Sequence, residues 1–461
     1  MLERWQNQEE ALQFAIAHPA CMLAMDMGTG KTRTAIDIVY ARDWTNKILI
    51  VCPKAVVGVW RENLKKFAPD DNYSVWDQRT GSVKTKAASM VEFLQNGSGK
   101  TFVVINYDSV WRKEMGDAVM KAGFEMVILD ESHRAKAAGS KVSKFLALLG
   151  KKVTYKLCLT GTPMANSPLD VYGQYRFLEP SIFGTNHYFF LQEYAIMGGP
   201  DHNFIVGYKN QQELNRKFKS IAYTCTMEDI KDRIKLPDHL PPMEIPVDLP
   251  ARDMKTMKQL NGEFISECNG AFVTAGNVLT KMLRLQQITS GFCLVQDNPM
   301  EQGFNVDLNT SKEDALADML SDMSPEASVV VFCVFRHDIL AIRRAADKAN
   351  RECFELSGEA DTLDEWKKHT GAVIAVQIQA GSEGVDMTKA RYAIYFSIPH
   401  SLAMYNQSKA RLYRPGQTAA VTFYHLIAKN TIDESMYESL TKKKDIIESI
   451  KNGTFNFGFI H

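Results

Sequence analysis

The residues AMDMGTGKT at positions 24–32 form a glycine turn between an apolar stretch and a helix-like stretch, the pattern of a loop that binds phosphate. Met25 stands where the strict G-x-x-x-x-G-K-[ST] pattern has its first glycine. Glycines let the backbone turn its amides toward an anion, and the N-terminus of the following helix favours negative charge. The loop is therefore expected to bind nucleotide phosphates through Gly28, Thr29, Gly30 and Lys31, with Thr32 as a ligand of Mg²⁺. A plain glycine turn before a helix is the alternative.

A second stretch, MVILDESH at positions 126–133, ends an apolar run in two acidic residues. Asp130 is expected to hold Mg²⁺, and Glu131 to orient and deprotonate the attacking water. A solvated acidic turn is the alternative for so short a motif. Its place after an apolar strand and downstream of Lys31 favours catalysis, so the two stretches together predict hydrolysis of a nucleoside triphosphate.

The residues TGTP at positions 160–163 follow another apolar run. The hydroxyl groups of Thr160 and Thr162 could bond the acidic motif and relay the loss of the γ-phosphate, and His133 is a candidate for the same coupling role. The alternatives are a simple strand-to-loop turn for the threonines and a satisfied core histidine for His133.

Gln407, Arg411 and Arg414 are spaced at i, i+4 and i+7, which predicts that they share one face of a helix. Two guanidinium groups on one face suit arginine fingers, which stabilise the charge of a phosphoryl-transfer transition state. A solvated basic face is the alternative, because charged helix faces are common.

The bulk composition is that of an ordinary soluble protein, with 461 residues, 45% of them hydrophobic and 23% charged, and a net charge of zero. This length predicts two or three domains. A neutral chain gives no general sign of a nucleic-acid partner, although a local basic groove would suffice to bind one. No apolar run approaches the ~18 residues of a membrane span, and the start, MLERWQNQEE, lacks the pattern of a signal peptide.

The eight cysteines lie at least 20 residues apart, which excludes a CxxC zinc pair. They are expected to be reduced and mostly buried thiols. A cytoplasmic location is expected, in the host cytoplasm if the gene belongs to a phage.

Short continuous apolar runs alternate with helix-like stretches through most of the chain, which predicts α/β architecture with parallel strands buried on both faces. The expected strands are Lys47–Cys52, Thr101–Ile105, Met126–Leu129, Tyr155–Leu159, Ser328–Phe335, Cys353–Leu356, Val373–Gln377 and Tyr392–Ser397.

A proline-rich stretch at 236–250 divides the chain, since five prolines in fifteen residues exclude a helix or a central strand. The expected domains are a first lobe at 1–235, a linker and helical segment at 236–310, and a second lobe at 311–461. Residues 251–290 have a helical pattern, and Ser311 is expected to begin a helix with Asp314 in a capping box.

With these motifs in place, the chain resembles superfamily-two helicase motors, most closely the Swi/Snf-type ATPases, over nearly its whole length. The stretch at 5–12, WQNQEEAL, is similar to the segment whose glutamine, here Gln8, reads adenine. The stretches DESHRAK at 130–136 and LTGTP at 159–163 resemble the acidic box and the motif that follows it. In the second half, LRLQQITSG at 283–291, AGSEGVDMT at 380–388 and RPGQ at 414–417 resemble further motifs. The resemblance implies that Gly384, Asp386 and Gln407 belong to the nucleotide site.

Other stretches resemble the family's nucleic-acid contacts. Ile48–Pro53, followed by Trp60 and Glu62, is similar to a segment that grips one DNA strand, and Asn106–Ser109 is similar to the next contact. Basic residues that trail the acidic box face DNA in the family. The resemblance thus implies nucleic-acid contacts by Lys54, Tyr107, Arg134 and Lys136, with ordinary surface solvation as the alternative for the charged residues.

The resemblance implies two RecA-like lobes, each a mostly parallel sheet flanked by helices with small helical insertions. It implies ATP and Mg²⁺ as cofactors, hydrolysis in an inter-lobe cleft, and movement along nucleic acid, preferably double-stranded DNA. We expect a monomer without membrane attachment. Whether a protein partner recruits the motor is left open.

Two rival functions remain. One is a strand-separating DNA or RNA helicase, although no β-hairpin wedge is evident in the sequence. The other is a non-hydrolysing, ATP-gated nucleic-acid-binding scaffold, which the presence of Lys31, Glu131, Arg411 and Arg414 disfavours.

Overall fold

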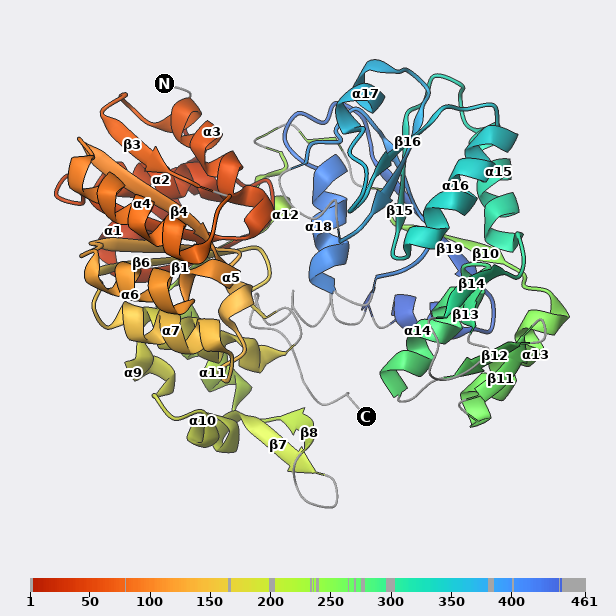
Figure 1. Cartoon of the computed structure of the whole chain (residues 1–461), viewed down its shortest axis with the longest axis horizontal. Helices are drawn as coiled ribbons and strands as arrows, with labels where there is room; N and C mark the ends of the chain where they lie inside the picture. The colour runs from red at the N-terminus through yellow and green to blue at the C-terminus, as the bar shows by residue number, and fades with distance from the viewer. Residues whose placement is uncertain are drawn as a thin grey trace. The chain divides into compact units, whose positions relative to one another are not determined.

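The structure is a computed structural model that describes residues 3–78, 80–164, 167–198, 204–232, 234, 236–237, 240–263, 265–268, 271–274, 278–295, 303–379, 385–399, 402–438 and 440–441. The chain divides into two compact units, one within Met1–Ile234 and the other within Lys235–Lys444 (Figure 1). Each unit is built around its own parallel sheet, so the expected α/β class with two mostly parallel sheets is confirmed.

The first unit contains a seven-stranded parallel sheet in the order β3-β4-β2-β5-β6-β1-β9. Its strands are β1 (Ala20–Met25), β2 (Lys47–Cys52), β3 (Tyr73–Trp76), β4 (Lys100–Asn106), β5 (Met126–Asp130), β6 (Tyr155–Thr160) and β9 (Ala222–Cys225). The predictions for β2, β4, β5 and β6 are confirmed to within one residue at each end. Because all strands are parallel, their carboxyl ends lie at one edge, where ligand sites of such sheets usually form.

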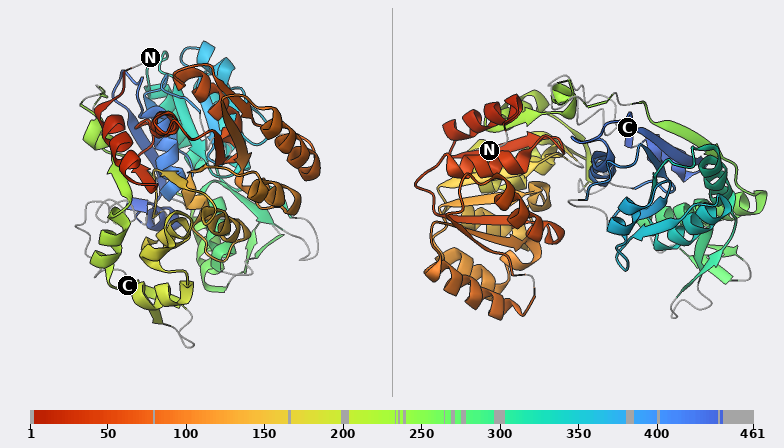
Figure 2. Two further views of the ribbon diagram at one scale, coloured as in Figure 1. Left: turned by 90° about the vertical axis from the view of Figure 1, so that its left-hand side faces the viewer. Right: turned by 90° about the horizontal axis from the view of Figure 1, so that it is seen from above.

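Helices cover both faces of this sheet (Figure 2). One face is covered by α1 (Gln6–Ala17), α2 (Lys31–Tyr40), α3 (Val57–Phe67) and α12 (Met227–Ile230). The other is covered by α4 (Val83–Asn96), α5 (Tyr107–Val110), α6 (Lys113–Lys121), α7 (Lys141–Gly150) and α8 (Val171–Leu178). Three short 3-10 turns follow strand or loop ends, namely η1 (Lys54–Val56), η2 (Ser132–Ala135) and η3 (Pro168–Asp170).

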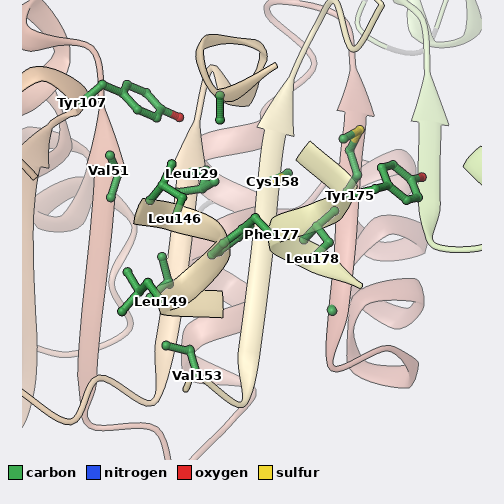
Figure 3. Close-up of a cluster of buried hydrophobic side chains, with 14 of the residues drawn as sticks. Val51, Tyr107, Leu129, Leu146, Leu149, Val153, Cys158, Tyr175, Phe177 and Leu178 are labelled. Carbon is green, nitrogen blue, oxygen red and sulfur yellow. The ribbon is translucent and has the colours of Figure 1, made fainter. Parts of the chain in front are cut away.

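Successive side chains of the buried strands alternate between the two cores, as strand geometry requires. In β2, Ile48 and Ile50 enter the core beneath α1–α3, while Val51 enters the core on the opposite face. Figure 3 shows that second core, with Val51 and Leu129 on neighbouring strands. Burial on both faces explains why these strands read as continuous apolar runs rather than alternating ones.

An insertion after α8 is rich in aromatic residues. It contains α9 (Pro180–Phe183), α10 (His187–Tyr194), α11 (Gln211–Lys219) and an antiparallel hairpin of β7 (Ala195–Gly198) and β8 (Phe204–Tyr208). Phe183, Phe190 and Tyr194 pack together, whereas Tyr188 and Phe189 are exposed. Figure 1 shows the hairpin extending past α10, away from the seven-stranded sheet.

The second unit contains a six-stranded parallel sheet in the order β10-β19-β18-β15-β17-β16. Its strands are β10 (Met243–Val247), β15 (Val329–Cys333), β16 (Cys353–Leu356), β17 (Val373–Gln377), β18 (Tyr392–Tyr395) and β19 (Thr422–Ala428). The helices are α13 (Ala251–Glu263), α14 (Val278–Thr289), α15 (Ser311–Asp322), α16 (Arg336–Lys348), α17 (Leu363–Lys368) and α18 (Leu402–Leu412). The predictions for β15–β18 are confirmed to within two residues at each end.

The segment between the two lobes differs from its prediction. The proline-rich stretch contains β10, which pairs with β19 at the edge of the second sheet. An edge strand tolerates Pro246 because one side of the strand donates no ladder hydrogen bond. The expectation that 251–290 is helical throughout is wrong, because the hairpin of β11 (Ile265–Cys268) and β12 (Ala271–Thr274) separates α13 from α14. A further hairpin, β13 (Phe292–Val295) and β14 (Phe304–Asp307), follows α14.

The expected capping box at the start of α15 is also wrong. Thr310, not Ser311, is the N-cap residue, and it makes no side-chain cap to the backbone. Its hydroxyl instead donates to Asp314 at 2.5 Å, while the amide of Ser311 donates to the side chain of Asn309 at 3.0 Å. The first free amide of the helix is thus satisfied by an upstream asparagine, as helix ends require.

Within the described residues, no helix combines the length and apolar character that crossing a membrane requires. Six free cysteines are buried, namely Cys21, Cys52, Cys158, Cys225, Cys293 and Cys333, and the free Cys353 is half-buried.

Candidate functional site

The phosphate loop joins β1 to α2 and depends on two glycines in the left-handed region. Gly28 has a φ of 81° and Gly30 a φ of 90°, conformations that other residues rarely adopt. A Cβ at Gly30 would also lie 2.0 Å from the side-chain nitrogen of Gln8. The loop therefore keeps its shape only with glycine at this position, which directs the backbone into the N-terminus of α2.

Lys31 is the first residue of α2, and its side chain is directed back over the loop. The ammonium donates to the carbonyl of Met25 at 2.8 Å and to that of Asp26 at 3.0 Å. Thr29 closes the same turn, because its hydroxyl donates to the carbonyl of Asp26 at 2.6 Å. Thr32 follows on α2, partly exposed.

Two buried amide side chains of α1 contact the phosphate loop. Asn7 donates to the carbonyl of Thr29 at 3.0 Å, and Gln8 lies against Gly30 while its carbonyl oxygen accepts from the amide of Trp5 at 3.0 Å. Gln8 thus lies at the loop, in the region where the resemblance places the adenine-reading residue. Asn7 was missed, since nothing in its sequence context distinguishes it from a helix surface residue.

The acidic pair lies at the carboxyl end of β5, where Asp130 is buried and Glu131 is half-buried. The carboxylate of Asp130 accepts from the indole of Trp60 at 3.0 Å and from the amide of Glu131 at 3.1 Å. Glu131 itself has a φ of 51°, a left-handed conformation that costs a non-glycine residue about 1 kcal/mol or more. Backbone strain of this kind is concentrated at functional sites.

The two carboxyl groups have opposite pKa shifts. Burial, reinforced by the adjacent charge of Glu131, raises the pKa of Asp130 to about 7, although Trp60 and Lys31 oppose the shift. Burial would also raise the pKa of Glu131, but the contact with His133 and the charges of His133, Lys31 and Arg134 outweigh it and lower that pKa. The charge of Lys31 acts on both groups, so the ammonium and the acidic pair lie within electrostatic reach of each other.

The residues expected to couple hydrolysis to movement lie beside the acidic pair. His133 Nδ1 is 3.3 Å from Glu131 Oε2 and 3.4 Å from the hydroxyl of Thr160. That hydroxyl also accepts from the amide of Thr162 at 3.1 Å. The strand order explains the proximity, because β6 pairs directly with β5.

Gln174 of α8 connects the same two loops and was missed by the sequence analysis. Its side chain is buried, accepts from the hydroxyl of Ser132 at 2.7 Å, and donates to the carbonyl of Pro163 at 2.8 Å. A glutamine inside an apolar helix carries no local sign of such a role, so only its tertiary contacts could reveal it.

The oxygen groups present fit a Mg²⁺ ion held partly by a bound triphosphate. No cluster of three or more potential metal-ligating His, Cys, Asp or Glu side chains occurs among the described residues. Mg²⁺ does not require one, since it usually takes one or two carboxylates together with substrate phosphates and water. Asp130 and the hydroxyl of Thr32 supply oxygen ligands of the right chemistry, next to a loop with amides turned by left-handed glycines.

The four residues expected to contact nucleic acid have different environments. Lys54 and Arg134 are exposed, in the turns after β2 and β5, which are neighbouring strands. Lys136 forms an ion pair with Asp170 at 3.1 Å. Tyr107 is a core residue with its hydroxyl donating to the carbonyl of Asp130 at 2.8 Å. A direct contact by the Tyr107 side chain is therefore not supported, because the ring is buried and its hydroxyl bonds the main chain of Asp130.

In the second unit, Gln407 and Arg411 lie on α18, and both are largely buried. The prediction that Arg414 shares their helix is wrong, because α18 ends at Leu412. Arg414 instead donates to the carbonyl of Val385 at 3.3 Å. The turn that follows is closed by Gln417, which donates to the carbonyls of Ala390 and Leu412.

The segment before α18 carries Asp386, whose carboxylate accepts from the amide and the hydroxyl of Thr388 at 2.9 and 2.8 Å. Burial would raise the pKa of Asp386, but these hydrogen bonds and the charge of Arg414 outweigh it and lower the pKa. Gly384, the other residue expected in this segment, lies outside the described residues. The two arginines and Asp386 thus belong to one polar region of the second unit.

Comparison with known proteins gives two family matches. The model of the SNF2-related domain matches residues 1–290, and that of the helicase conserved C-terminal domain matches residues 311–416. The first match alone covers more than half of the chain.

Similar curated proteins include the DNA annealing helicase and endonuclease ZRANB3 of Bos taurus, 24% identical over 97% of this chain and 40% of that protein. An uncharacterized ATP-dependent helicase of Mycoplasma genitalium is also 24% identical, over 95% of this chain and 40% of that protein. The chain thus spans about two-fifths of the length of these relatives. A solved structure, the Sulfolobus solfataricus SWI2/SNF2 ATPase core in complex with dsDNA, has a TM-score of 0.45 and 20% identity, covering 98% of this chain and 94% of that one.

Proposed function

Because the chain belongs to the family defined by an SNF2-related domain, here followed by a helicase conserved C-terminal domain, we propose that it is an ATP-dependent motor that moves along nucleic acid, with duplex DNA as its track. The observation that carries this proposal is the convergence of Lys31, Asp130 and Glu131 at the carboxyl edge of the first sheet. A cation and two acids of opposite pKa shift, beside a loop of left-handed glycines, suit phosphoryl transfer to water.

In the proposed reaction, the ammonium of Lys31 leaves the carbonyls of the loop and neutralises the β- and γ-phosphates of ATP. Glu131 stays ionised because its pKa is lowered, so its carboxylate can orient the attacking water and accept a proton from it. His133, 3.3 Å from that carboxylate, fixes its direction. Asp130 and Thr32 would hold a Mg²⁺ ion, which would supply Lewis-acid polarisation of the phosphate oxygens when bound.

Arg411 and Arg414 are the proposed arginine fingers of the second unit. Positive charge placed on a phosphoryl-transfer transition state contributes about 10³–10⁵ in rate. Their substitution by alanine should therefore lower kcat far more than it weakens nucleotide binding, and equal losses in both would remove them from this role.

The test of the proposed function is the rate of phosphate release with duplex DNA, single-stranded DNA and RNA in parallel. DNA is the polymer expected to stimulate hydrolysis most, because the ZRANB3 relative is named a DNA annealing helicase. Duplex DNA should stimulate the wild-type protein most, and Lys31→Ala should abolish the stimulated rate. Full stimulated hydrolysis by Lys31→Ala would contradict the proposal. The absence of any phosphate release would instead favour the ATP-gated scaffold.

Strand separation is a second candidate function, and the β7–β8 hairpin is the observation that favours it. Its residues Ile196 and Ile205 are each 45% exposed, and the preceding α10 exposes Tyr188 and Phe189. Exposed apolar and aromatic side chains can stack on unpaired bases. This hairpin was not predicted, because its strands are short and their register is irregular between Ile196 and Met197.

A forked duplex tests this candidate. Ile205→Ala should reduce unwinding while leaving DNA-stimulated ATP hydrolysis intact. Ile16→Ala, which removes an equally exposed isoleucine from α1, is the matched control and should unwind normally. Normal unwinding by both variants would remove the hairpin from strand separation, and a wild-type protein that hydrolyses ATP but does not unwind the fork would leave translocation without separation as the function.

A further inference from the structure

Two aromatic side chains of the first unit hold Asp130 from different directions. The indole nitrogen of Trp60 donates to its carboxylate at 3.0 Å, and the hydroxyl of Tyr107 donates to its backbone carbonyl at 2.8 Å. Trp60 is 1% exposed and Tyr107 4% exposed. Since the amide of Glu131 bonds the other carboxylate oxygen, the orientation of the Asp130 side chain is fixed by donors on both of its oxygens.

The two aromatic residues belong to the segments that follow β2 and β4. Trp60 lies one turn into α3, directly after the η1 turn that begins at the exposed Lys54. Tyr107 is the first residue of α5, next to the exposed Asp108. The strands run side by side in the order β4-β2-β5, so both segments leave the sheet at the edge where Asp130 lies.

We propose that Trp60 and Tyr107 are positioning residues that couple nucleic-acid binding at the ends of β2 and β4 to the placement of the Asp130 carboxylate. A phosphate backbone that binds near Lys54 displaces the start of α3, and the buried indole transmits this displacement to the carboxylate because a close-packed core does not absorb it. Tyr107 holds the main chain at Asp130, so the displacement rotates the side chain rather than the strand. The proposal rests on the proposed function.

Ordinary stabilisation is the competing role for both hydrogen bonds, because a buried carboxylate needs donors. That role predicts a loss of stability, and equal changes in nucleotide affinity with and without DNA. A coupling role predicts that the ratio of the two affinities changes. Coupling between two ligands is reciprocal, so either binding equilibrium reports it.

The experiment measures the Kd of a fluorescent ADP analogue with Mg²⁺, in the absence and in the presence of saturating duplex DNA. Tyr107→Phe keeps the packed ring and removes only the hydroxyl donor, whereas Trp60→Phe keeps an aromatic ring but removes part of the indole together with its N–H donor. Each variant should reduce the DNA-induced change in Kd by about fivefold or more, within the usual range of coupling between sites. Because the readout is a ratio, a general weakening of the site cancels.

Two matched controls remove equivalent hydrogen bonds elsewhere in the same unit. Trp76→Phe removes an indole bond to the hydroxyl of Ser89, and Tyr175→Phe removes a hydroxyl bond to the carbonyl of Phe218. Both controls should keep the wild-type ratio. The coupling role is overturned if Trp60→Phe and Tyr107→Phe keep the wild-type ratio, or if the controls reduce it equally.

The wild-type protein separates this proposal from the proposed function. A wild type with DNA-stimulated hydrolysis but unaffected variants overturns the coupling role alone. If nucleic acid changes neither the nucleotide affinity nor the hydrolysis rate of the wild-type protein, both the coupling role and the proposed function are overturned. Tyr107→Phe keeps the test decisive if Trp60→Phe does not fold.

Discussion

The carboxyl edges of the two sheets differ in the arrangement of their charged side chains. In the first unit, the acidic pair lies in a strand-end loop with a strained backbone at Glu131, and the Lys31 ammonium donates to the carbonyls of Met25 and Asp26. In the second unit, Lys312 and Asp433 form a fully buried ion pair at 2.6 Å. The acids of the first unit thus lie beside a strained backbone, whereas the buried charges of the second unit form an ion pair with each other.

The buried pair of the second unit joins four elements. Lys312 of α15 also donates to the carbonyl of Phe396, just past β18. Asp433 accepts from the hydroxyl of Thr289 on α14 and from the amide of Ala428 at the end of β19. With every partner satisfied, this network holds the unit together. Burial alone therefore does not mark a reactive charge, and the backbone strain at Glu131 is the feature that distinguishes the site of the first unit.

Substitution of Glu131 should give the largest effect on activity. Glu131→Gln should lower ATP hydrolysis by about 10²–10⁴-fold, the usual contribution of a general base. The urea midpoint should stay the same or rise, because a buried charge is removed. The control is Glu125→Gln, a carboxylate at the opposite end of the same strand that accepts from the amide of Lys47. Normal hydrolysis by Glu131→Gln would show that Glu131 is not the general base.

Substitution of Asp433 should have the opposite profile. Asp433→Asn leaves the charge of Lys312 buried and unpaired, and should cost about 3–5 kcal/mol of unfolding free energy. Hydrogen exchange of the amides in α15 measures this loss within the second unit. Asp314→Asn, which removes an exposed pair with Lys348, should cost about 1 kcal/mol or less. Equal protection in both variants would mean that the buried pair does not hold the unit together.

His425 should make the stability of the second unit depend on pH. Burial, and then the charge of Lys409, lowers the pKa of His425 to about 3. The folded state therefore excludes a proton that the unfolded chain binds, so stability is complete above pH ~6.5 and falls as the pH drops, by about 1.4 kcal/mol per pH unit.

Unfolding titrations of the wild type and of His425→Phe between pH 7 and pH 5 measure this effect. Only the wild type should show the additional slope, while His369→Gln, a substitution of an exposed histidine, should keep it. A slope unchanged by His425→Phe would assign the pH dependence to another group.

In the first unit, pH should act on ligand binding instead. Mg²⁺ binds the ionised carboxylate, and the pKa of Asp130 is raised to about 7, so binding of Mg²⁺ with nucleotide should release a proton near neutral pH. Affinity should fall by about threefold between pH 7.5 and pH 6.5. Calorimetry in two buffers of different ionisation enthalpy measures the proton, and buffer-independent enthalpies would contradict the shift.

The sequence could predict features that depend on neighbouring residues. Buried strands such as β2 and β17 are rich in Val, Ile and Leu, so their bounds were predicted correctly. Asp130 and Glu131 were recognised because they lie at the end of such a strand, and Lys31 because it follows the glycine turn of the phosphate loop. In contrast, β1 has the sequence ACMLAM, in which weak strand formers conceal a fully buried strand.

The features that the sequence concealed depend on contacts between distant segments. Trp60 and Gln174 look like ordinary helix residues until α3 and α8 pack beside the acidic pair. The Lys312–Asp433 pair joins segments far apart in the chain. The prediction of a helical Arg414 failed for a local reason, because α18 ends before the turn at Pro415 and Gly416, and such residues follow helix ends.

Displacement of a third strand from a DNA triplex tests the central claim most directly, because it reports movement along a duplex without requiring strand separation. We expect displacement by the wild-type protein with ATP and Mg²⁺, and none by Glu131→Gln under the same conditions. Displacement by Glu131→Gln at the wild-type rate, or none by a wild-type protein that hydrolyses ATP on the same DNA, would contradict it.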